Sequence, residues 1–171
     1  MPAITVRIAE TDADFVAARR LCAEWLDWHW QNFPADGPRE GNPLDPATFQ
    51  VVIDTLEQIH TRPRGAVLLA EVDGQARGCV MYHEAGATTA EVKRLFVNES
   101  GRGHGLGRLL LEKMFSSMAE DGYKDVMFSS ARFLIHARRL YESVGFRDMA
   151  SPEGLPDEIA RFIYFMERPL A

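Results

Sequence analysis

Glycine and arginine gather in one short stretch of the chain, Arg102-Gly103-His104-Gly105-Leu106-Gly107-Arg108, which runs into a helical pattern. Glycine lacks a Cβ and accepts backbone angles that other residues resist, so successive amide N–H groups can converge on one anion. The first turn of the helix adds unpaired N–H donors and the positive end of its dipole. Together with the two arginine charges, this stretch predicts a binding site for a phosphate compound.

Two familiar phosphate motifs do not fit this stretch. A dinucleotide fingerprint needs glycine where Arg108 stands, and a P-loop needs lysine and then serine or threonine where the chain has Arg108 and Leu109. The spacing that remains is R-x-x-G-x-G, which begins at Arg102. Alone, this short pattern fits an ordinary glycine-rich turn equally well, so its flanks decide between the two interpretations.

The flanks of the glycine stretch resemble the GCN5-related N-acetyltransferase (GNAT) superfamily. Residues 91–97, EVKRLFV, follow the family pattern E-x-x-x-L-x-V, and residues 137–146, ARRLYESVGF, follow A-x-x-L-Y-E-x-x-G-F. The resemblance covers residues 65–149 in order and spacing, and several linked motifs are more specific than one loop. The chain departs from the family at Leu134, where many members carry an asparagine that contacts the cofactor.

The resemblance implies one domain, residues 1–171, of mixed α/β (α+β) class, with a central, mostly antiparallel, splayed sheet of about six or seven strands flanked by about four helices. Hydrophobic patterning agrees with this layout. It predicts strands at 4–8, 66–72, 75–82, 90–97, 126–128 and 162–166, and helices after a cap at Thr11 or Asp12, at 47–60, at 107–121 and around 137–144. Asp73-Gly74 is a turn typical of a hairpin, and residues 31–46, with four prolines, predict a long loop.

The resemblance also implies acetyl-CoA as co-substrate. Its pantetheine arm would lie along the backbone of Leu95, Phe96 and Val97, where the sheet splays. The residues expected around its pyrophosphate are Arg102, Gly103, His104, Gly105, Leu106, Gly107 and Arg108. Strict alternation along residues 91–97 would place Lys93 on one side with Leu95, and Arg94 on the other with Phe96. Neither side is then uniformly apolar, which is a pattern that a strand interrupted by a bulge would tolerate but that does not require a bulge.

Acetyl transfer from a thioester to an amine requires that the amine lose a proton, and the resemblance assigns this task to Glu91. An unperturbed glutamate titrates near 4.3 and an alkylammonium near 10, so direct proton transfer is uphill by roughly 8 kcal/mol. Glu91 would therefore need burial or a relay through water. Two alternatives stay open: Glu91 is an ion-pair partner of Lys93 or Arg94, or His83 is the base.

The departing thiolate must be protonated, and Tyr141 matches the family tyrosine whose hydroxyl faces the thioester sulfur. A phenol near pKa 10 and a thiol near 8.5 differ by about 2 kcal/mol, which permits a proton transfer late in the reaction. The alternative is packing, because Tyr141 shares a helical stripe with Ala137, Leu140 and Val144. The oxyanion donor would be a backbone N–H near Phe96 or Val97.

Composition narrows the range of partners. A net charge of −6 argues against a nucleic-acid binder, which would normally show a basic face. The start of the chain lacks a signal-peptide pattern, and no apolar run approaches the roughly 18 residues that span a bilayer. Cys22 and Cys79 form no disulfide framework, and no histidine pair has zinc-ligand spacing. We therefore expect a cytoplasmic protein with no metal and no membrane partner.

The sequence leaves the acceptor open. We expect a primary amine on a small molecule. The resemblance implies that it enters opposite the cofactor, at residues 25–46 and 151–158, where acidic side chains would suit a cationic amine. A peptide N-terminus, a longer acyl-CoA and a non-catalytic CoA-binding regulator are the alternatives. A homodimer is also left open.

Overall fold

One sheet of seven strands organises the part of the chain that this computed structural model describes, residues 1–40 and 42–171. Its strands lie in the order β1-β2-β3-β4-β5-β7-β6, and every neighbouring pair is antiparallel except β4 with β5. The strands are β1 (Ile4–Ile8), β2 (Ala66–Val72), β3 (Gln75–Glu84), β4 (Thr89–Val97), β5 (Asp125–Ala131), β6 (Arg147–Met149) and β7 (Ile163–Pro169). The predicted mixed, mostly antiparallel sheet is confirmed.

The described residues form six α-helices, two of them a single turn long, where about four were predicted. They are α1 (Asp12–Asn32), α2 (Pro46–Asp54), α3 (Leu56–Ile59), α4 (Leu106–Glu120), α5 (Ile135–Ser143) and α6 (Asp157–Ala160), with a 3₁₀ turn, η1 (Glu99–Gly101), before α4. The helix predicted at 47–60 is wrong in one respect, because it is broken at Thr55 into α2 and α3. There the β-branched side chain donates its hydroxyl to the carbonyl of Val51, which competes with continued helix.

Two turns match their predictions. Asp73 and Gly74 both have positive φ, 50° and 77°, as a two-residue hairpin turn requires, and they join β2 to β3. The long loop predicted at 31–46 runs from Phe33 to Asp45 between α1 and α2, although Gly41 within it lies outside the described residues.

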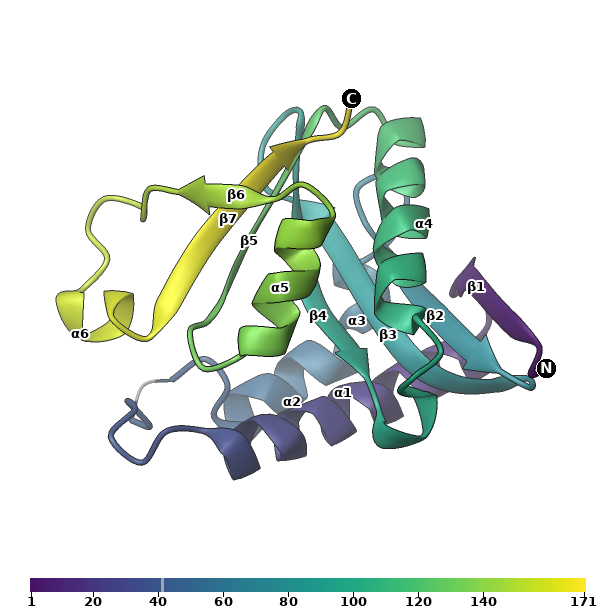
Figure 1. Ribbon diagram of the computed structural model, residues 1–171, viewed down its shortest axis with the longest axis horizontal. Helices are drawn as coiled ribbons and strands as arrows, with labels where there is room; N and C mark the ends of the chain where they lie inside the picture. The colour runs from purple at the N-terminus through teal and green to yellow at the C-terminus, as the bar shows by residue number, and fades with distance from the viewer. Residues whose placement is uncertain (41) are drawn as a thin grey trace.

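Helices cover both faces of the sheet and divide the core into two layers. Figure 1 shows α4 and α5 on the near side, where α4 buries Leu106, Leu110 and Leu111 against β2, β3 and β4. On the far side lie α1, α2 and α3, which pack Leu21 and Phe49 against the opposite faces of β2 and β3. We call these two sides the α4 face and the α1 face.

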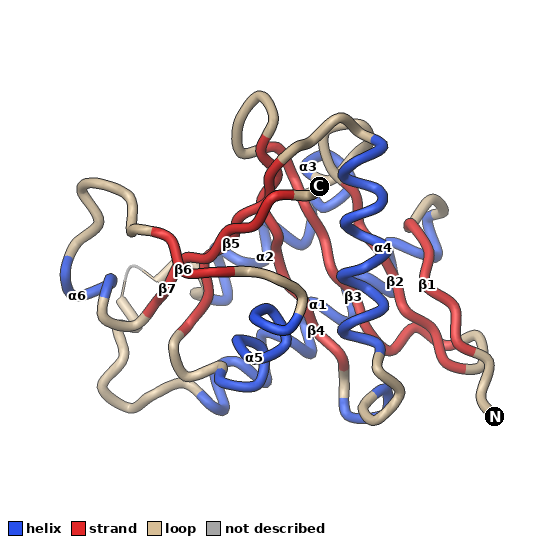
Figure 2. Tube along the Cα trace, turned by 45° about the horizontal axis from the view of Figure 1, so that its top comes forward, coloured by secondary structure: helices blue, strands red, loops and turns tan. Residues whose placement is uncertain are grey.

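Strands β4 and β5 pair over only three residues before they diverge. Their parallel register runs from Thr89–Asp125 to Glu91–Met127, after which β4 continues beside β3 and β5 continues beside β7. Figures 1 and 2 both show the two strands separating, with α5 standing beside the divergence. From Val92 onward, the edge of β4 that faces away from β3 therefore has no strand partner among the described residues.

A local network fixes the start of α1. The Thr11 side chain accepts from the Asp14 amide, and the Asp14 carboxylate accepts in return from the Thr11 and Glu10 amides, which forms a capping box. Arg7 of β1 binds the same carboxylate with two hydrogen bonds of 2.9 and 2.7 Å. These contacts hold the pKa of the buried Asp14 well below its ordinary value, with Arg7 as the main cause.

We expect Asp14→Asn to lower the free energy of unfolding at pH 7 by about 1–2 kcal/mol, because it removes a paired, hydrogen-bonded carboxylate. Since folding depresses this pKa, the stabilisation is fully present above the ordinary aspartate pKa near 4 and is lost as the pH falls below it. Urea unfolding measures the difference in unfolding free energy between Asp14→Asn and the wild type, and we expect that difference to be smaller at pH 3 than at pH 7. Asp12→Asn, at an exposed position of the same turn, is the control. Equal differences at both pH values would contradict the assignment.

Candidate functional site

The glycine stretch forms an open turn between η1 and α4. Gly103 and Gly105 have φ of +81° and +70°, a backbone region that favours glycine, and no atom of the described residues lies within 4 Å of the position a Cβ would take at either. Gly105 is the N-cap of α4, and it has no side chain to bind the first amides of the helix. The turn therefore presents unpaired N–H groups in open space, which fits an incoming phosphate.

The side chains of this turn divide into buried and exposed ones. Leu106 is 1% exposed and belongs to the core, so its contribution to a ligand is limited to its amide. Arg102 and Arg108 are exposed, and Arg108 Nη2 donates to Ser143 Oγ of α5 at 2.8 Å. A Cβ at Gly107 would lie 2.8 Å from Leu140 Cδ2, so glycine at this position allows the close approach of α4 and α5.

Strand β4 carries a bulge, which its sequence pattern permitted. Its register with β3 shifts between Met81–Lys93 and Cys79–Phe96, so two residues of β4 oppose one of β3, and Arg94 has a φ of +52°. Lys93 and Phe96 pair with residues that pack on the α1 face, whereas Leu95 and Val97 pack on the α4 face. The expectation that Lys93 shares a side with Leu95 is therefore wrong, because the extra residue at the bulge reverses the alternation beyond it.

Tyr141 lies on the α4 face, next to the divergence of the strands. Its ring stacks on Phe128 of β5 at a centroid distance of 3.9 Å, and Phe128 directly follows Met127, the last residue of β5 that pairs with β4. The last turn of α5 is held by the Phe146 amide, which donates to the Tyr141 carbonyl, and by Gly145 with a φ of +96°. Burial raises the pKa of the Tyr141 phenol, so the side chain is protonated at neutral pH.

Glu91 lies on the α1 face within a small charged cluster. Its carboxylate forms an ion pair with Lys93, 2.8 Å from Nζ to Oε1, and its other oxygen is 3.5 Å from His83 Nε2. Glu91 and His83 are paired across β4 and β3, so the two candidate bases are neighbours. The ion pair with Lys93 that sequence reasoning left open is present, whereas Arg94 makes no ion pair with Glu91.

Glu91 and Tyr141 therefore lie on opposite faces of the sheet, both next to the point where β4 and β5 diverge. Glu91 forms the last parallel pair with Met127, and Tyr141 covers the residue after Met127. An extended ligand along the free edge of β4 would pass between the two side chains. Its far end would reach the open turn at Gly103 and Gly105, because β4 leads through η1 into that turn.

A cavity of about 450 Å³ opens on the α1 face beside the end of β4. Its lining joins the C-terminal half of α1 to the residues that follow β4, and it includes two predicted site residues, Phe96 and Arg102. The other lining residues are Glu24, Asp27, Trp28, Gln31, Asn32, Asn98 and Glu99. Four of these residues, Asp27, Trp28, Gln31 and Asn32, fall within the segment 25–46 that was expected near the acceptor.

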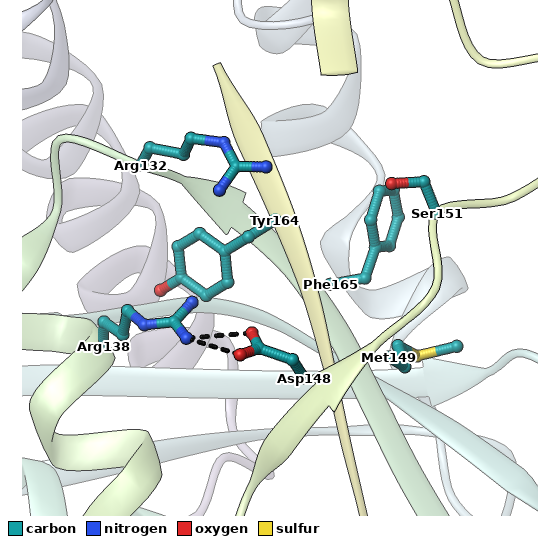
Figure 3. Close-up of a pocket in the computed structure, with 7 residues that line it drawn as sticks. All are labelled: Arg132, Arg138, Asp148, Met149, Ser151, Tyr164 and Phe165. Atoms are coloured by element: carbon teal, nitrogen blue, oxygen red, sulfur yellow. Dashed lines mark hydrogen bonds and ion pairs between the residues drawn. The ribbon is translucent and has the colours of Figure 1, made fainter. Parts of the chain in front are cut away.

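A second cavity, of about 380 Å³, lies where α5 meets β6 and β7 (Figure 3). Figure 3 shows Arg138 beside Asp148, with Nη2 2.9 and 2.8 Å from the two carboxylate oxygens, and its guanidinium is 4.7 Å from the centroid of the Tyr164 ring. None of the predicted site residues lines this cavity, apart from Ser151 in the expected acceptor segment.

Leu134, the position where the resemblance implied an asparagine, is the N-cap of α5 and makes no side-chain capping bond. Its amide donates to the carbonyl of Ala131 at 3.1 Å. A ligand at this position can therefore contact only main-chain groups and an apolar side chain.

The described residues contain neither a candidate metal site nor a membrane-spanning helix. No group of three or more His, Cys, Asp or Glu side chains among them is arranged to hold a metal ion. No helix within residues 1–40 and 42–171 is long and apolar enough to cross a membrane.

Known proteins resemble this chain in sequence. The model of the acetyltransferase (GNAT) family matches residues 22–146, more than half of the chain. An uncharacterised N-acetyltransferase of Schizosaccharomyces pombe is 36% identical over 105 residues, which are 58% of this chain and 64% of that protein. Human N-acetylaspartate synthetase is 29% identical over 121 residues, 66% of this chain and 40% of the synthetase. The chain thus matches less than two thirds of the length of either relative.

Solved structures resemble it in fold. A GNAT-family acetyltransferase from Staphylococcus aureus superposes with a TM-score of 0.74 at 17% identity, covering 99% of this chain and 100% of the other. An acetyltransferase from Salmonella typhimurium, solved with its cofactor acetyl-CoA, has a TM-score of 0.67 at 20% identity and coverages of 99% and 95%. At these identities the likeness shows the fold. The family match, the splayed sheet and the glycine turn agree, and the chain belongs to the acetyltransferase (GNAT) family.

Proposed function

We propose that this protein transfers an acetyl group from acetyl-CoA to a primary amine of a small molecule, directly and without a covalent enzyme intermediate. The divergence of β4 from β5 between Glu91 and Tyr141 carries the proposal, because it leaves a free strand edge between a candidate base and a candidate acid. The membership of the family and a fold shared with an acetyl-CoA complex support the choice of cofactor.

When bound, acetyl-CoA supplies the activated acetyl thioester. The chain's own groups would hold it in two places. The amides of residues 103–108 and the N-terminus of α4 bind the pyrophosphate, with Arg102 and Arg108 adding positive charge. The free edge of β4 at Leu95, Phe96 and Val97 offers backbone groups to the pantetheine amides, as a neighbouring strand would.

Glu91 removes the proton from the acceptor amine in this proposal. It lies on the α1 face, as does the cavity beside α1, so base and acceptor share one side of the sheet. His83, 3.5 Å away, can pass the proton onward to solvent. An N–H of β4 near Phe96 or Val97 stabilises the oxyanion as the carbonyl is attacked.

Tyr141 protonates the departing thiolate from the α4 face. Burial raises the pKa of the Tyr141 phenol, so the hydroxyl stays protonated at neutral pH and can donate a hydrogen bond to the thiolate, although complete proton transfer is more uphill than from an exposed phenol. Phe128 and Phe146 pack the ring on two sides, with centroids 3.9 and 5.5 Å away, and hold it in place.

The acceptor is a small amine in this proposal. The name of the human relative, N-acetylaspartate synthetase, describes a small N-acetylated molecule, which supports this choice. Thiol release from acetyl-CoA, measured over a panel of amines, tests the proposal. Release that depends on one amine class supports it, whereas tight CoA binding without release for any amine identifies a non-catalytic CoA-binding module.

We expect Tyr141→Phe to lower kcat by about 10–100-fold while CoA affinity changes little, because the variant keeps the ring and loses only the proton donor. Single-turnover thiol release measures the chemical step. Tyr123→Phe is the matched control, since it removes a buried hydroxyl that donates to the Arg64 carbonyl, remote from the site. Unchanged turnover in Tyr141→Phe would assign Tyr141 to packing alone.

Gly105→Ala is expected to weaken CoA binding about 10-fold, because a Cβ at φ +70° costs roughly 1–2 kcal/mol of strain and shifts the amides of the turn. Gly122→Ala, at the other end of α4 with φ +94°, imposes similar strain away from the site. Calorimetric titration of both variants with CoA compares them. Equal losses of affinity would show that the turn has no special part in binding.

Glu91→Gln is expected to lower kcat by about 100-fold and to leave CoA affinity unchanged, because general-base catalysis contributes about 10²–10⁴-fold. His83→Gln should cost less, since His83 only passes the proton on. Steady-state kinetics of both variants shows whether Glu91 or His83 is the base. A larger loss in His83→Gln than in Glu91→Gln would transfer the role of base to His83.

A further inference from the structure

Arg94 holds a largely buried positive charge on the α1 face. Its Nε donates to Met81 Sδ at 3.1 Å, its Nη2 donates to His60 Nε2 at 2.9 Å, and its guanidinium lies 5.9 Å from the centroid of the Phe49 ring. Burial lowers the pKa of Arg94, yet arginine keeps its charge inside proteins. The site therefore contains a cation among mainly apolar neighbours.

These neighbours do not neutralise the charge. Among the described residues no carboxylate lies within 4 Å of Arg94, and the nearby Glu91 is engaged by Lys93 and His83. His60 is neutral, because burial lowers its pKa to about 3. A thioether and an aromatic face are weak partners compared with a carboxylate.

The hydrogen bonds of His60 fix the guanidinium in place. Since Arg94 can only donate, His60 Nε2 must be the acceptor, and His60 Nδ1 must then carry the proton that it donates to the Tyr82 carbonyl at 2.9 Å. Nη1 of Arg94 makes no hydrogen bond to the described residues. It also keeps some contact with solvent. It therefore offers N–H donors to a ligand.

The backbone at Arg94 adds a second cost. Its φ of +52° is uncommon for a residue with a long side chain and strains the backbone. Glycine or asparagine would occupy this bulge position with less strain. A strained backbone and a charge without a carboxylate partner thus coincide at one residue of β4, between Glu91 and Leu95.

We propose that Arg94 binds a carboxylate of the acceptor, which makes the substrate class amino acids and related amino carboxylates, with His60 as the residue that positions Arg94. The inference rests on the proposed function, because it concerns the molecule that enters beside Glu91. A guanidinium and a carboxylate form two parallel hydrogen bonds, so one carboxylate would supply the missing charge and fill the free donors.

The CoA phosphates are a less suitable counter-ion. Their proposed site is the turn at Gly103 and Gly105, beyond the end of β4, whereas the Arg94 side chain turns back toward Met81 and His60. Lys93 adds another positive charge on the same face, although Glu91 offsets it. The local charge without a ligand is therefore positive, as carboxylate binding requires.

Matched sets of amines test this inference on the full chain with acetyl-CoA. Each set contains a free amino acid, its primary amide and its decarboxylated amine, and the panel spans acidic, apolar and polar side chains. We expect at least 30-fold higher kcat/KM for the carboxylate member of the preferred set. Acetylation of the amide or the amine as fast as the amino acid would overturn the inference and leave acetyl transfer intact.

A variant of Arg94 shows whether this residue causes the preference for a carboxylate. Arg94→Met keeps an unbranched side chain but removes the charge and every N–H donor, and it is expected to raise KM for the amino acid by about 30–100-fold, because a charge-assisted hydrogen-bond pair is lost. Its CoA affinity and thermal midpoint should stay close to wild type, since replacing a buried charge by an apolar side chain is often neutral. Arg64→Met, on an arginine whose side chain is 81% exposed, is the matched control. A comparable loss of CoA affinity in Arg94→Met would identify a CoA phosphate as the counter-ion and overturn the inference.

His60 has its own test as a positioning residue. His60→Leu removes the acceptor and should raise KM for the amino acid with kcat within about twofold, and His60→Gln, which can accept a hydrogen bond, should restore part of the KM. Unchanged KM in His60→Leu would remove His60 from the account.

A binding measurement tests the carboxylate site even if the protein releases no thiol with any amine. If no amine of the panel is acetylated, the proposed function fails, and the same amino acids are then titrated calorimetrically into CoA-saturated protein. Binding that Arg94→Met abolishes supports the carboxylate site independently of turnover. Absence of binding to every amino acid overturns it.

Discussion

The interrupted pairing of β4 and β5 is the constraint on which the site depends. Three parallel pairs align the strands, and after Glu91–Met127 each strand follows a different neighbour, β3 on one side and β7 on the other. A bulge at Arg94 lies just beyond that point, and bulges bend and twist a strand locally. The core remains filled despite the divergence, because α4 and α5 cover one face and α1, α2 and α3 cover the other. The fold thus keeps a free backbone edge without opening its interior.

The two faces contribute different chemistry to this edge. On the α4 face the neighbours are aromatic and apolar, and they hold Tyr141 as a neutral phenol. The α1 face carries the charges, with the Glu91–Lys93 pair beside His83 and the buried cation of Arg94 close by. The strand between them keeps the proposed acid and base apart. One group can then protonate the thiolate while the other removes the proton from the ammonium.

Much of this arrangement was predictable from sequence, because local patterns determine it. The hairpin at Asp73-Gly74, the capping box at Thr11 and the glycine turn all depend on residues close together in the chain, and the structure contains all three. The break at Thr55 and the short strand β6 were missed, since both lack a strong periodic signal. The position of the bulge was also beyond the pattern, and with it the side of Lys93, whereas Arg94 and Phe96 do share a side as expected. No sequence signal showed that Arg94 is buried beside His60, because residues 34 positions apart meet there only through tertiary packing.

Hydrogen exchange measured with and without CoA tests the central claim most directly, since it reads the backbone edge itself. The account predicts that CoA slows amide exchange in two segments, at Leu95–Val97 of β4 and at Gly103–Arg108, while the fully paired strand β2 is unchanged. Protection confined to other parts of the chain, or none at CoA concentrations that saturate binding, would contradict the claim that the free edge of β4 and the glycine turn form one ligand site.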